Sequence, residues 1–293
     1  MPAELPFLDP SACPSFDHRS AARDALRGLA VGDAFGAQFF VPDNLPGLRE
    51  RRLPAAEWPW TDDTEMACSV FDVLRRRGSV DQHELAHGFA HRHDFDRGYG
   101  PAMNRLLRLV REGGRWQELA AELFDGQGSW GNGAAMRVAP LGAWFAVDPA
   151  EAAAQAGRSA RVTHTHPEAV AGAVAVAVGA ACAARGRVRP VTGAQLLAAV
   201  EELTPEGRVR SGVAEARVTH WRVDGRHSNA YAEWQRMGSP IAPTRPQYDA
   251  LQAAARLARL EGAPAAVRVE GGSATLAFAL PRQGVSLVVL DWR

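Results

Sequence analysis

Helical periodicity dominates the first two thirds of the chain. Apolar residues in Ser20–Val31 recur at i, i+4 and i+8, and Thr64–Arg77 repeats this pattern. The same spacing predicts further helices over Gln82–His93, Ala102–Glu112, Trp116–Leu123, Ala134–Phe145, Pro149–Ala156, Pro167–Ala184 and Gly193–Leu203. A strand is the alternative for any single segment, but so many long periodic segments favour an all-α bundle.

The pattern changes near Arg217. One more helix is expected over Gln247–Leu260. Short β-branched runs separated by turn residues then predict a three-stranded meander over Ala266–Glu270, Ala274–Leu280 and Val285–Leu290. The sequence therefore predicts a mainly α fold in two pieces, a helical domain over residues 1–216 and a small α+β segment over residues 217–293.

Composition narrows the classes of partner. Among the 293 residues, 33 basic side chains balance 33 acidic ones, so nothing favours a nucleic-acid partner. Every basic residue except histidine is arginine. Clustered arginines bind phosphate, but here the bias extends along the whole chain, and we attribute it to a coding preference for Arg, Ala and Gly.

The expected compartment is the cytoplasm. The three cysteines, Cys13, Cys68 and Cys182, are far apart and suit a reducing environment better than a disulfide framework. The first 16 residues lack the apolar segment of a signal peptide. The most apolar run, Ala169–Ala184, is short for a membrane span and is better explained as a buried helix. We therefore expect no membrane partner.

An acidic motif opens the second main helix. Thr61, Asp62 and Asp63 place a hydroxyl and two carboxylates side by side at a helix N-terminus. Such residues also serve as an ordinary helix cap, and taken alone the cap is the better explanation. Two adjacent carboxylates exceed what one cap needs, however. Their oxygen donors suit Mg²⁺, Mn²⁺ or Ca²⁺ rather than Zn²⁺.

Two glycine-containing segments are candidate ligand loops. Gly128-Ser129-Trp130-Gly131-Asn132-Gly133 leads into the predicted helix Ala134–Phe145, where close backbone approach and free N–H groups favour an anion. Its alternative is a glycine-rich turn with an asparagine cap. Arg97-Gly98-Tyr99-Gly100 precedes another helix and offers either a flexible substrate loop with an aromatic platform or an ordinary turn.

Histidines give a weaker signal. In Thr163-His164-Thr165-His166-Pro167, two imidazoles lie two residues apart, without a third ligand for a zinc set. Such residues more often cap a helix or contact a ligand. A second group, His83, His87, His91 and His93, is interpreted as a solvated helix face.

These segments, taken together and in order, resemble the ADP-ribosylglycohydrolases, a family that includes the dinitrogenase reductase-activating glycohydrolases. The resemblance covers about residues 20–216. It rests on Arg27–Gly36 (RGLAVGDAFG), Trp60–Thr64, Arg97–Gly100, Gly128–Gly142 and Thr163–Pro167. It implies an orthogonal all-α fold, one or two Mg²⁺ or Mn²⁺ ions, and hydrolysis of the bond between ADP-ribose and a protein side chain.

The resemblance also implies residue roles. Thr61, Asp62 and Asp63 would be metal ligands, and one of the two aspartates would assist attack at the anomeric carbon. The remaining positions would contact an ADP-ribosylated protein or a small ADP-ribose derivative; they are Gly98, Tyr99, Gly100, Gly128, Ser129, Trp130, Gly131, Asn132 and His164.

The sequence departs from the family in two places. Some members carry a glutamate shortly after the Gly-Asp-Ala turn, where this chain has Gln38-Phe39-Phe40. The family's second acidic motif, Asp-x-Asp-Thr near the C-terminus, has no counterpart, because no Asp-x-Asp occurs after Gly128. We therefore expect a truncated domain with impaired activity. The alternatives are a non-catalytic ADP-ribose- or nucleotide-binding protein and a defunct fusion product.

The C-terminal segment carries a different resemblance. Residues 221–293 are similar to the C-terminal end of family 39 β-xylosidases, through His227–Tyr231, Met237–Pro240 and Leu280–Arg282 among others. The catalytic glutamates of those enzymes lie in an upstream barrel that is absent here. This similarity therefore brings no xylosidase chemistry.

Overall fold

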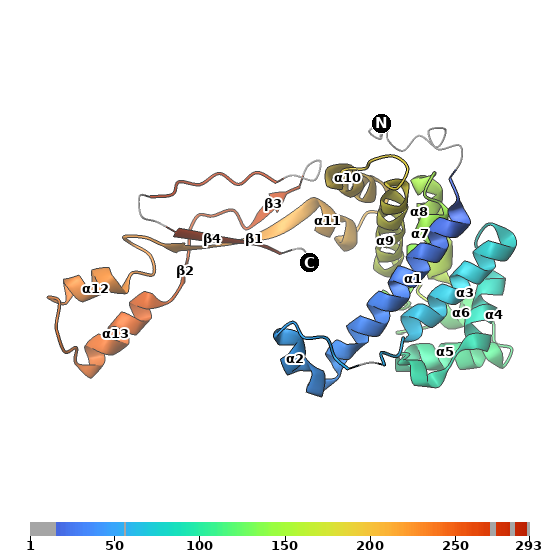
Figure 1. The fold of residues 1–293 in the computed structure, drawn as a ribbon, viewed down its shortest axis with the longest axis horizontal. Coiled ribbons are helices and arrows are strands. Elements are labelled where there is room, and N and C mark those ends of the chain that lie inside the picture. The colour runs from blue at the N-terminus through green and yellow to red at the C-terminus, as the bar shows by residue number, and fades with distance from the viewer. Residues whose placement is uncertain (1–15, 56, 270–273, 282–284, 292–293) are drawn as a thin grey trace. The chain divides into compact units, whose positions relative to one another are not determined.

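A computed structural model describes residues 16–55, 57–269, 274–281 and 285–291. The chain forms two compact units, Met1–Ser211 and Gly212–Arg293. The first unit is helical, and the second combines two helices with a small sheet (Figure 1). The expected fold class, mainly α with a small C-terminal α+β segment, is confirmed.

The first unit consists of helices joined by turns and by longer connections. These helices are α1 (His18–Gly36), α2 (Leu45–Arg49), α3 (Asp62–Arg77), α4 (Gln82–Arg92), α5 (Pro101–Arg111), α6 (Trp116–Ala121), α7 (Ala139–Trp144), α8 (Pro149–Arg161), α9 (Pro167–Arg185) and α10 (Gly193–Leu203). The longer connections include those before α3 and before α7. Helix α11 (Arg208–Ala214) spans the division between the units. Short 3₁₀ helices cover Ala37–Phe40, Pro42–Asn44, Phe95–Arg97 and Asn132–Ala134.

Helix α3 shows how local sequence sets the limits of an element. Thr61 is its N-cap, with a side chain that accepts from the Asp63 N–H. Acidic residues occupy the first turn and arginines the last, so each group is opposite in charge to the end of the helix dipole beside it. Gly78 ends the helix at a φ of 76°, a left-handed conformation that glycine adopts without strain.

The core of the first unit surrounds α9. This helix packs against α7, α8 and α10, while α1 lies against α3 and α7 (Figure 1). Among the described residues, α9 is the one helix long and apolar enough to cross a membrane. Its buried residues include Ala173, Val174 and Ala177, which lie inside the helical unit as the sequence predicts. A Cβ on Gly142 of α7 would collide with the Ala177 carbonyl, so this contact requires glycine.

The predicted helix over Ala134–Phe145 is wrong in its extent. The glycine loop enters a 3₁₀ helix at Asn132–Ala134, and α7 begins only at Ala139. Pro140 accounts for the late start, because it has no N–H to bond to the carbonyl four residues earlier and is tolerated only in the first turn of a helix. The loop therefore does not lead directly into a long helix.

The second unit is built around one strand. Its elements are β1 (Glu215–Val223), α12 (Ala230–Arg236), α13 (Arg245–Ala255), β2 (Ala258–Arg259), β3 (Ala266–Arg268) and β4 (Val285–Asp291). Strand β1 pairs antiparallel with each of the other three. The predicted three-stranded meander is therefore wrong, since Ala274–Leu280 is not a strand and the central strand was missed. Glu270, at the end of one predicted strand, lies outside the described residues.

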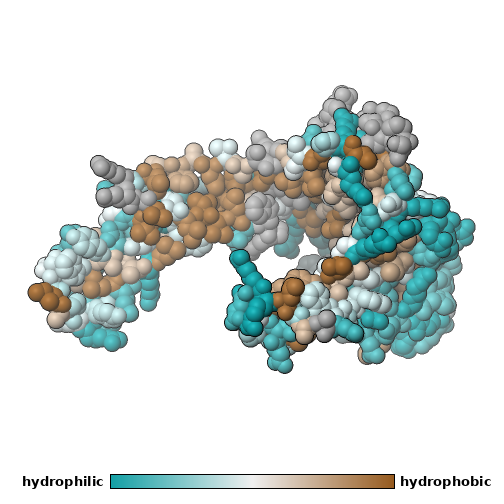
Figure 2. All heavy atoms as spheres, in the orientation of Figure 1, coloured by the Kyte–Doolittle hydropathy of each residue, from teal (hydrophilic) through white to brown (hydrophobic). Residues whose placement is uncertain are grey.

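Strand β1 was missed because half of its buried positions are polar. Ala216, Val218, His220 and Arg222 alternate along it and are all buried. Two of these four are ionisable, which hides the alternation of apolar residues that a sequence search uses. The same unit leaves large apolar side chains exposed, including Ile241, Leu257 and Leu287, and brown spheres mark its apolar surface in Figure 2.

Candidate active site

A cavity of about 890 Å³ lies at the N-terminus of α3. It is lined by Leu29, Gly32, Asp33, Gly36, Ala37, Phe40, Thr61, Asp62, Asp63, Gly98, Gly100, Asn132 and Met136. The lining thus brings together α1, the acidic motif, segment 94–100 and the glycine loop. Four segments with separate signals in the sequence therefore meet in one place, and the third of these signals is Arg97–Gly100, within segment 94–100.

Asp33 holds the acidic motif in position. Its carboxylate accepts from the Thr61 N–H at 2.8 Å and the Thr61 hydroxyl at 2.6 Å. It also accepts from the Thr64 N–H at 3.2 Å and the Thr64 hydroxyl at 2.6 Å. One side chain on α1 therefore satisfies free donors at the start of α3.

Asp33 was not among the predicted site residues. The signal was present, because this aspartate belongs to the Gly32-Asp33-Ala34 turn that supports the family resemblance. Its partners lie 28 and 31 residues away, however, and sequence spacing alone does not reveal such a contact.

Three carboxylates, those of Asp33, Asp62 and Asp63, crowd one edge of the cavity, and none of the lining residues is basic. Burial, together with the neighbouring Asp63 carboxylate, raises the pKa of Asp62 to about 6. Burial and the Asp33 carboxylate also raise the pKa of Asp63. The protein thus holds like charges close together in a partly desolvated place, at a cost in free energy that a bound cation would offset.

The donor set fits a hard divalent cation. Carboxylate and hydroxyl oxygens are the ligands that Mg²⁺ and Mn²⁺ prefer, and Mg²⁺ keeps several waters when the protein supplies few ligands. Among the residues that the structure describes, no three His, Cys, Asp or Glu side chains form a group that could hold a metal ion. The acidic edge therefore offers oxygen donors on one side of the cavity rather than a complete cage.

Segment 94–100 forms another wall of the cavity through Gly98 and Gly100. Between them, Tyr99 is only 6% exposed, and its hydroxyl donates to Glu65 Oε1 at 2.8 Å. The interpretation of Tyr99 as an exposed aromatic platform is therefore wrong. Its ring supports the segment from inside the core.

Arg97 ties this segment to the acidic motif. The Arg97 guanidinium lies 3.6 Å from the centroid of the Trp60 ring and donates to the Trp60 carbonyl at 3.2 Å. Asp94 forms an ion pair with the same guanidinium at 3.3 Å. Trp60 immediately precedes Thr61, so the two walls of the cavity are connected by direct contacts.

Only the end of the glycine loop reaches the cavity lining, through Asn132 and the nearby Met136. Gly128 has a φ of 75°, and a Cβ there would collide with Thr165. Trp130 is 63% exposed, and its ring centroid lies 5.5 Å from that of His166. The predicted residues Gly128 to Gly131 therefore border the cavity-lining residues in sequence without lining the cavity themselves.

His164 supports the loop from behind. The side chain is 4% exposed and does not line the cavity. Burial and the nearby Arg137 guanidinium lower the pKa of His164 to about 3, so the imidazole is neutral. The Thr163 hydroxyl lies 2.8 Å from His164 Nδ1 and accepts from Arg137 at 2.9 Å. A Cβ on Gly133 would lie 2.7 Å from His164 Cε1, so the imidazole packs directly against the loop.

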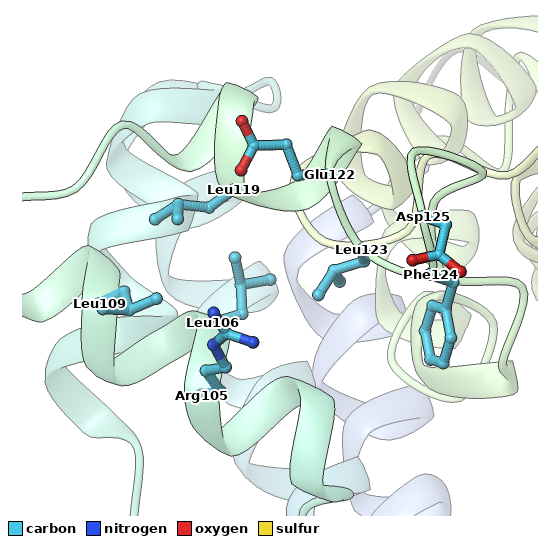
Figure 3. Close-up of a pocket in the computed structure, with 8 residues that line it drawn as sticks. All are labelled: Arg105, Leu106, Leu109, Leu119, Glu122, Leu123, Phe124 and Asp125. Carbon is cyan, nitrogen blue, oxygen red and sulfur yellow. The ribbon is translucent and has the colours of Figure 1, made fainter.

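A different cavity of about 250 Å³ lies between α5, α6 and the turn that follows α6 (Figure 3). Leucines 106, 109, 119 and 123 supply much of its lining, together with Phe124. Its two carboxylates, Glu122 and Asp125, are well separated in Figure 3 and do not form a shared site. This cavity lacks the convergent oxygen donors of the larger one, which we therefore take as the candidate active site.

Comparison with known proteins points to one family. The family model for ADP-ribosylglycohydrolase matches residues 14–280. The ADP-ribosylhydrolase ARH3 of Xenopus tropicalis is 30% identical over 211 residues, which cover 67% of this chain and 60% of the relative. The human ARH3 is 32% identical over 171 residues, covering 50% of this chain and 45% of the relative.

A bacterial relative gives a similar result. The ADP-ribosyl-[dinitrogen reductase] glycohydrolase of Rhodospirillum rubrum is 30% identical over 160 residues, covering 50% of this chain and 52% of the relative. The chain thus spans about half to three fifths of the length of the relatives described here.

Proposed function

The chain belongs to the ADP-ribosylglycohydrolase family, and from this premise we propose that it removes ADP-ribose from modified protein side chains with the help of Mg²⁺ or Mn²⁺. The observation that carries the proposal is the meeting of Asp33, Asp62 and Asp63 at one edge of an 890 Å³ cavity. Relatives named ADP-ribosylhydrolase and ADP-ribosyl-[dinitrogen reductase] glycohydrolase support the substrate class.

Thr61, Asp62 and Asp63 are the proposed ligands of the cation. A divalent cation bound there supplies Lewis-acid stabilisation of developing negative charge. One of the two aspartates is also the proposed acceptor of the proton that the attacking water loses. In the proposed reaction, water attacks the anomeric carbon and the bond to the protein side chain breaks. The proton that water loses passes through a carboxylate to the leaving side chain.

The remaining walls of the cavity are the proposed substrate contacts. Gly98, Gly100 and Asn132 line it directly. Gly128 to Gly131 are proposed to receive the diphosphate where the loop extends beyond the lining, and Trp130 offers an exposed ring for the adenine. His164 and Tyr99 are proposed to act indirectly, by holding the two loops in place.

Turnover is proposed to be slow. Two cations need carboxylates from both sides of a cleft, whereas the sequence lacks an Asp-x-Asp after Gly128. Among the described residues, no metal-binding group of three ligands is assembled. This observation favours one second candidate, a protein that binds ADP-ribose without hydrolysing it. Cytoplasmic location and the absence of nucleic-acid and membrane partners remain part of the proposal.

Thermal unfolding with and without Mg²⁺ or Mn²⁺ tests the metal site. A cation that binds only the folded chain raises Tm, and the Asp62→Asn, Asp63→Asn double variant should lose this rise. In EDTA the same variant should unfold at a Tm equal to or above that of the parent chain, because it removes like charges whose pKa values are raised.

The matched control is the Glu201→Gln, Glu202→Gln double variant on α10, which also removes two adjacent carboxylates. It should keep the full metal-induced rise in Tm. An equal rise in the Asp62, Asp63 variant and in the control would mean that the cation binds elsewhere.

A further inference from the structure

A cavity of about 550 Å³ is formed largely by one face of α5. It is lined by His93, Phe95, Asn104, Arg105, Arg108 and Arg111. Phe95 belongs to segment 94–100, whose Gly98 and Gly100 line the candidate active site. The volume lies in the range of small-molecule sites, about 300–1,000 Å³, and no carboxylate lines this cavity.

The arginines give this cavity a positive charge that is only partly neutralised. Arg111 donates from Nε to the Ala90 carbonyl at 2.6 Å and from Nη2 to the His93 carbonyl at 2.9 Å. These neutral acceptors fix the guanidinium without cancelling its charge. Arg108 forms an ion pair with Glu112 at 3.1 Å, and both side chains are exposed, so water screens that pair strongly.

Of the three arginines, Arg105 has the fewest contacts that would give it a structural role in the fold. Arg108 and Arg111 lie in the last turn of α5, where cations stabilise a helix without any ligand. Arg105 lies in the middle of the helix, and the part of the chain that the structure describes contains no hydrogen bond or ion pair to its guanidinium. It also lines the 250 Å³ cavity together with Glu122 and Asp125 but forms no ion pair with either, so its charge is available to an external anion.

Phe95 adds an aromatic surface to the same cavity. Phe95 begins a 3₁₀ helix, and its side chain is 71% exposed to solvent rather than packed in the core. Another part of the lining is held by hydrogen bonds, because Asn104 accepts from His93 Nε2 at 2.7 Å and donates to the Tyr99 carbonyl at 2.9 Å. Guanidinium groups bind phosphate oxygens, and an exposed aromatic ring stacks on a base.

We propose that this cavity is an accessory binding site for a nucleoside phosphate, with the phosphate on Arg105, Arg108 and Arg111 and the base on Phe95. The site is separate from the acidic cavity and does not rest on the proposed hydrolysis. An acidic peptide would satisfy the arginines but would leave Phe95 without a role, so we favour the nucleotide. The ligand is either a free nucleotide or the nucleotide end of a larger substrate.

Titration of the full-length chain with AMP in EDTA at low ionic strength tests the proposal. Without a cation, the carboxylates of the acidic cavity repel phosphate, and the AMP binding that is lost when the arginines are replaced reports on the arginine site. The Arg105→Gln, Arg108→Gln variant should weaken AMP binding at least about tenfold, because it removes two charged donors to the phosphate. Phe95→Ala should weaken it at least about fivefold, the lower range for base stacking, and leave inorganic phosphate binding unchanged.

Two controls separate this site from the rest of the molecule. Arg23→Gln removes an exposed charge from α1 and should leave AMP affinity unchanged. The Asp62→Asn, Asp63→Asn variant should also keep AMP binding, so a failed accessory site and a failed hydrolase are distinguishable. If Arg105→Gln binds ADP-ribosylated protein more weakly than the parent chain does, the ligand of this site is the nucleotide end of the substrate. If that binding is unchanged, the ligand is a free nucleotide.

Three results would overturn the proposal. The first is the absence of saturable AMP binding in EDTA. The second is a loss of AMP affinity in Arg23→Gln as large as that in the Arg105→Gln, Arg108→Gln variant, because this would indicate non-specific attraction. The third is a tetraglutamate peptide that binds as tightly as AMP and equally well to Phe95→Ala, which would assign the surface to acidic peptides instead.

Discussion

At the scale of single residues, the candidate active site depends on Asp33 more than the sequence indicated. Adjacent aspartates after a threonine predict a helix cap with surplus negative charge, and that much is visible in the chain itself. The contacts of Asp33 with Thr61 and Thr64 join helices far apart in sequence. The burial of Tyr99 was equally hidden, since an aromatic residue between glycines suits a surface loop as well as a buried anchor.

Replacing Asp33 should therefore weaken the fold as well as the site. Asp33→Asn keeps one accepting oxygen and places an NH₂ group against donors, so we expect a loss of about 2 kcal/mol in the free energy of unfolding. Urea denaturation measures this loss. The exposed Asp43→Asn serves as a matched control and should stay within about 0.5 kcal/mol of the parent chain. Equal stability of the two variants would contradict the role assigned to Asp33.

His164 should make stability depend on pH. Its pKa in the folded chain, about 3, lies below the ordinary value of 6.5, so the unfolded chain binds the extra proton first. Its contribution to stability is complete above about pH 6.5 and is lost as the pH falls towards 3, with a slope of up to about 1.4 kcal/mol per pH unit.

Denaturation between pH 4 and 7 should show a shallower acid-side slope for His164→Gln than for the parent chain. The exposed His91→Gln is the control and should keep the parent slope. Parallel curves for His164→Gln and the parent chain would show that this imidazole is not held neutral in the folded state.

At the scale of elements, helices with strong local signals were predicted well. Helix α10 has the predicted limits, Gly193–Leu203, because a capping box between Thr192 and Gln195 marks its start. Helix α7 and strand β1 were not predicted correctly. The first depends on a proline within an apolar run, and the second buries His220 and Arg222 through contacts that sequence patterns do not reveal.

The glycine loop offers a test of binding that spares the fold. Gly131 has a φ of −65°, and a Cβ there would meet nothing closer than 3.7 Å, so Gly131→Val should keep its Tm within about 2 °C. The added side chain should nevertheless block close approach of a diphosphate and weaken ADP-ribose binding at least about tenfold. Calorimetric titration in the presence of Mg²⁺ measures the change.

Gly133→Ala provides the contrast. Its Cβ would press on the His164 ring at 2.7 Å, so this variant should lose stability. Unchanged ADP-ribose affinity in Gly131→Val would show that the diphosphate does not bind at this loop.

At the scale of the whole molecule, every residue of the acidic cavity lies in the first unit, between Leu29 and Met136. The family model extends to residue 280, beyond the resemblance seen in the sequence, while the chain spans 45% to 60% of the curated relatives discussed above. The similarity of residues 221–293 to a β-xylosidase end and the domain limit at residue 216 remain predictions. One acidic edge with no identified partner motif is the basis for expecting slow turnover.

Release of ADP-ribose from an ADP-ribosylated protein, with excess Mg²⁺ or Mn²⁺, tests the central claim most directly. We predict release that requires the cation, is abolished in the Asp62→Asn, Asp63→Asn variant, and is at least about a hundredfold slower than the median enzyme rate of about 10 s⁻¹. Release at the same rate in that variant or in EDTA would contradict the assignment of the acidic cavity. A cation-dependent rate near about 10 s⁻¹ would contradict the claim that the missing second acidic motif impairs the enzyme.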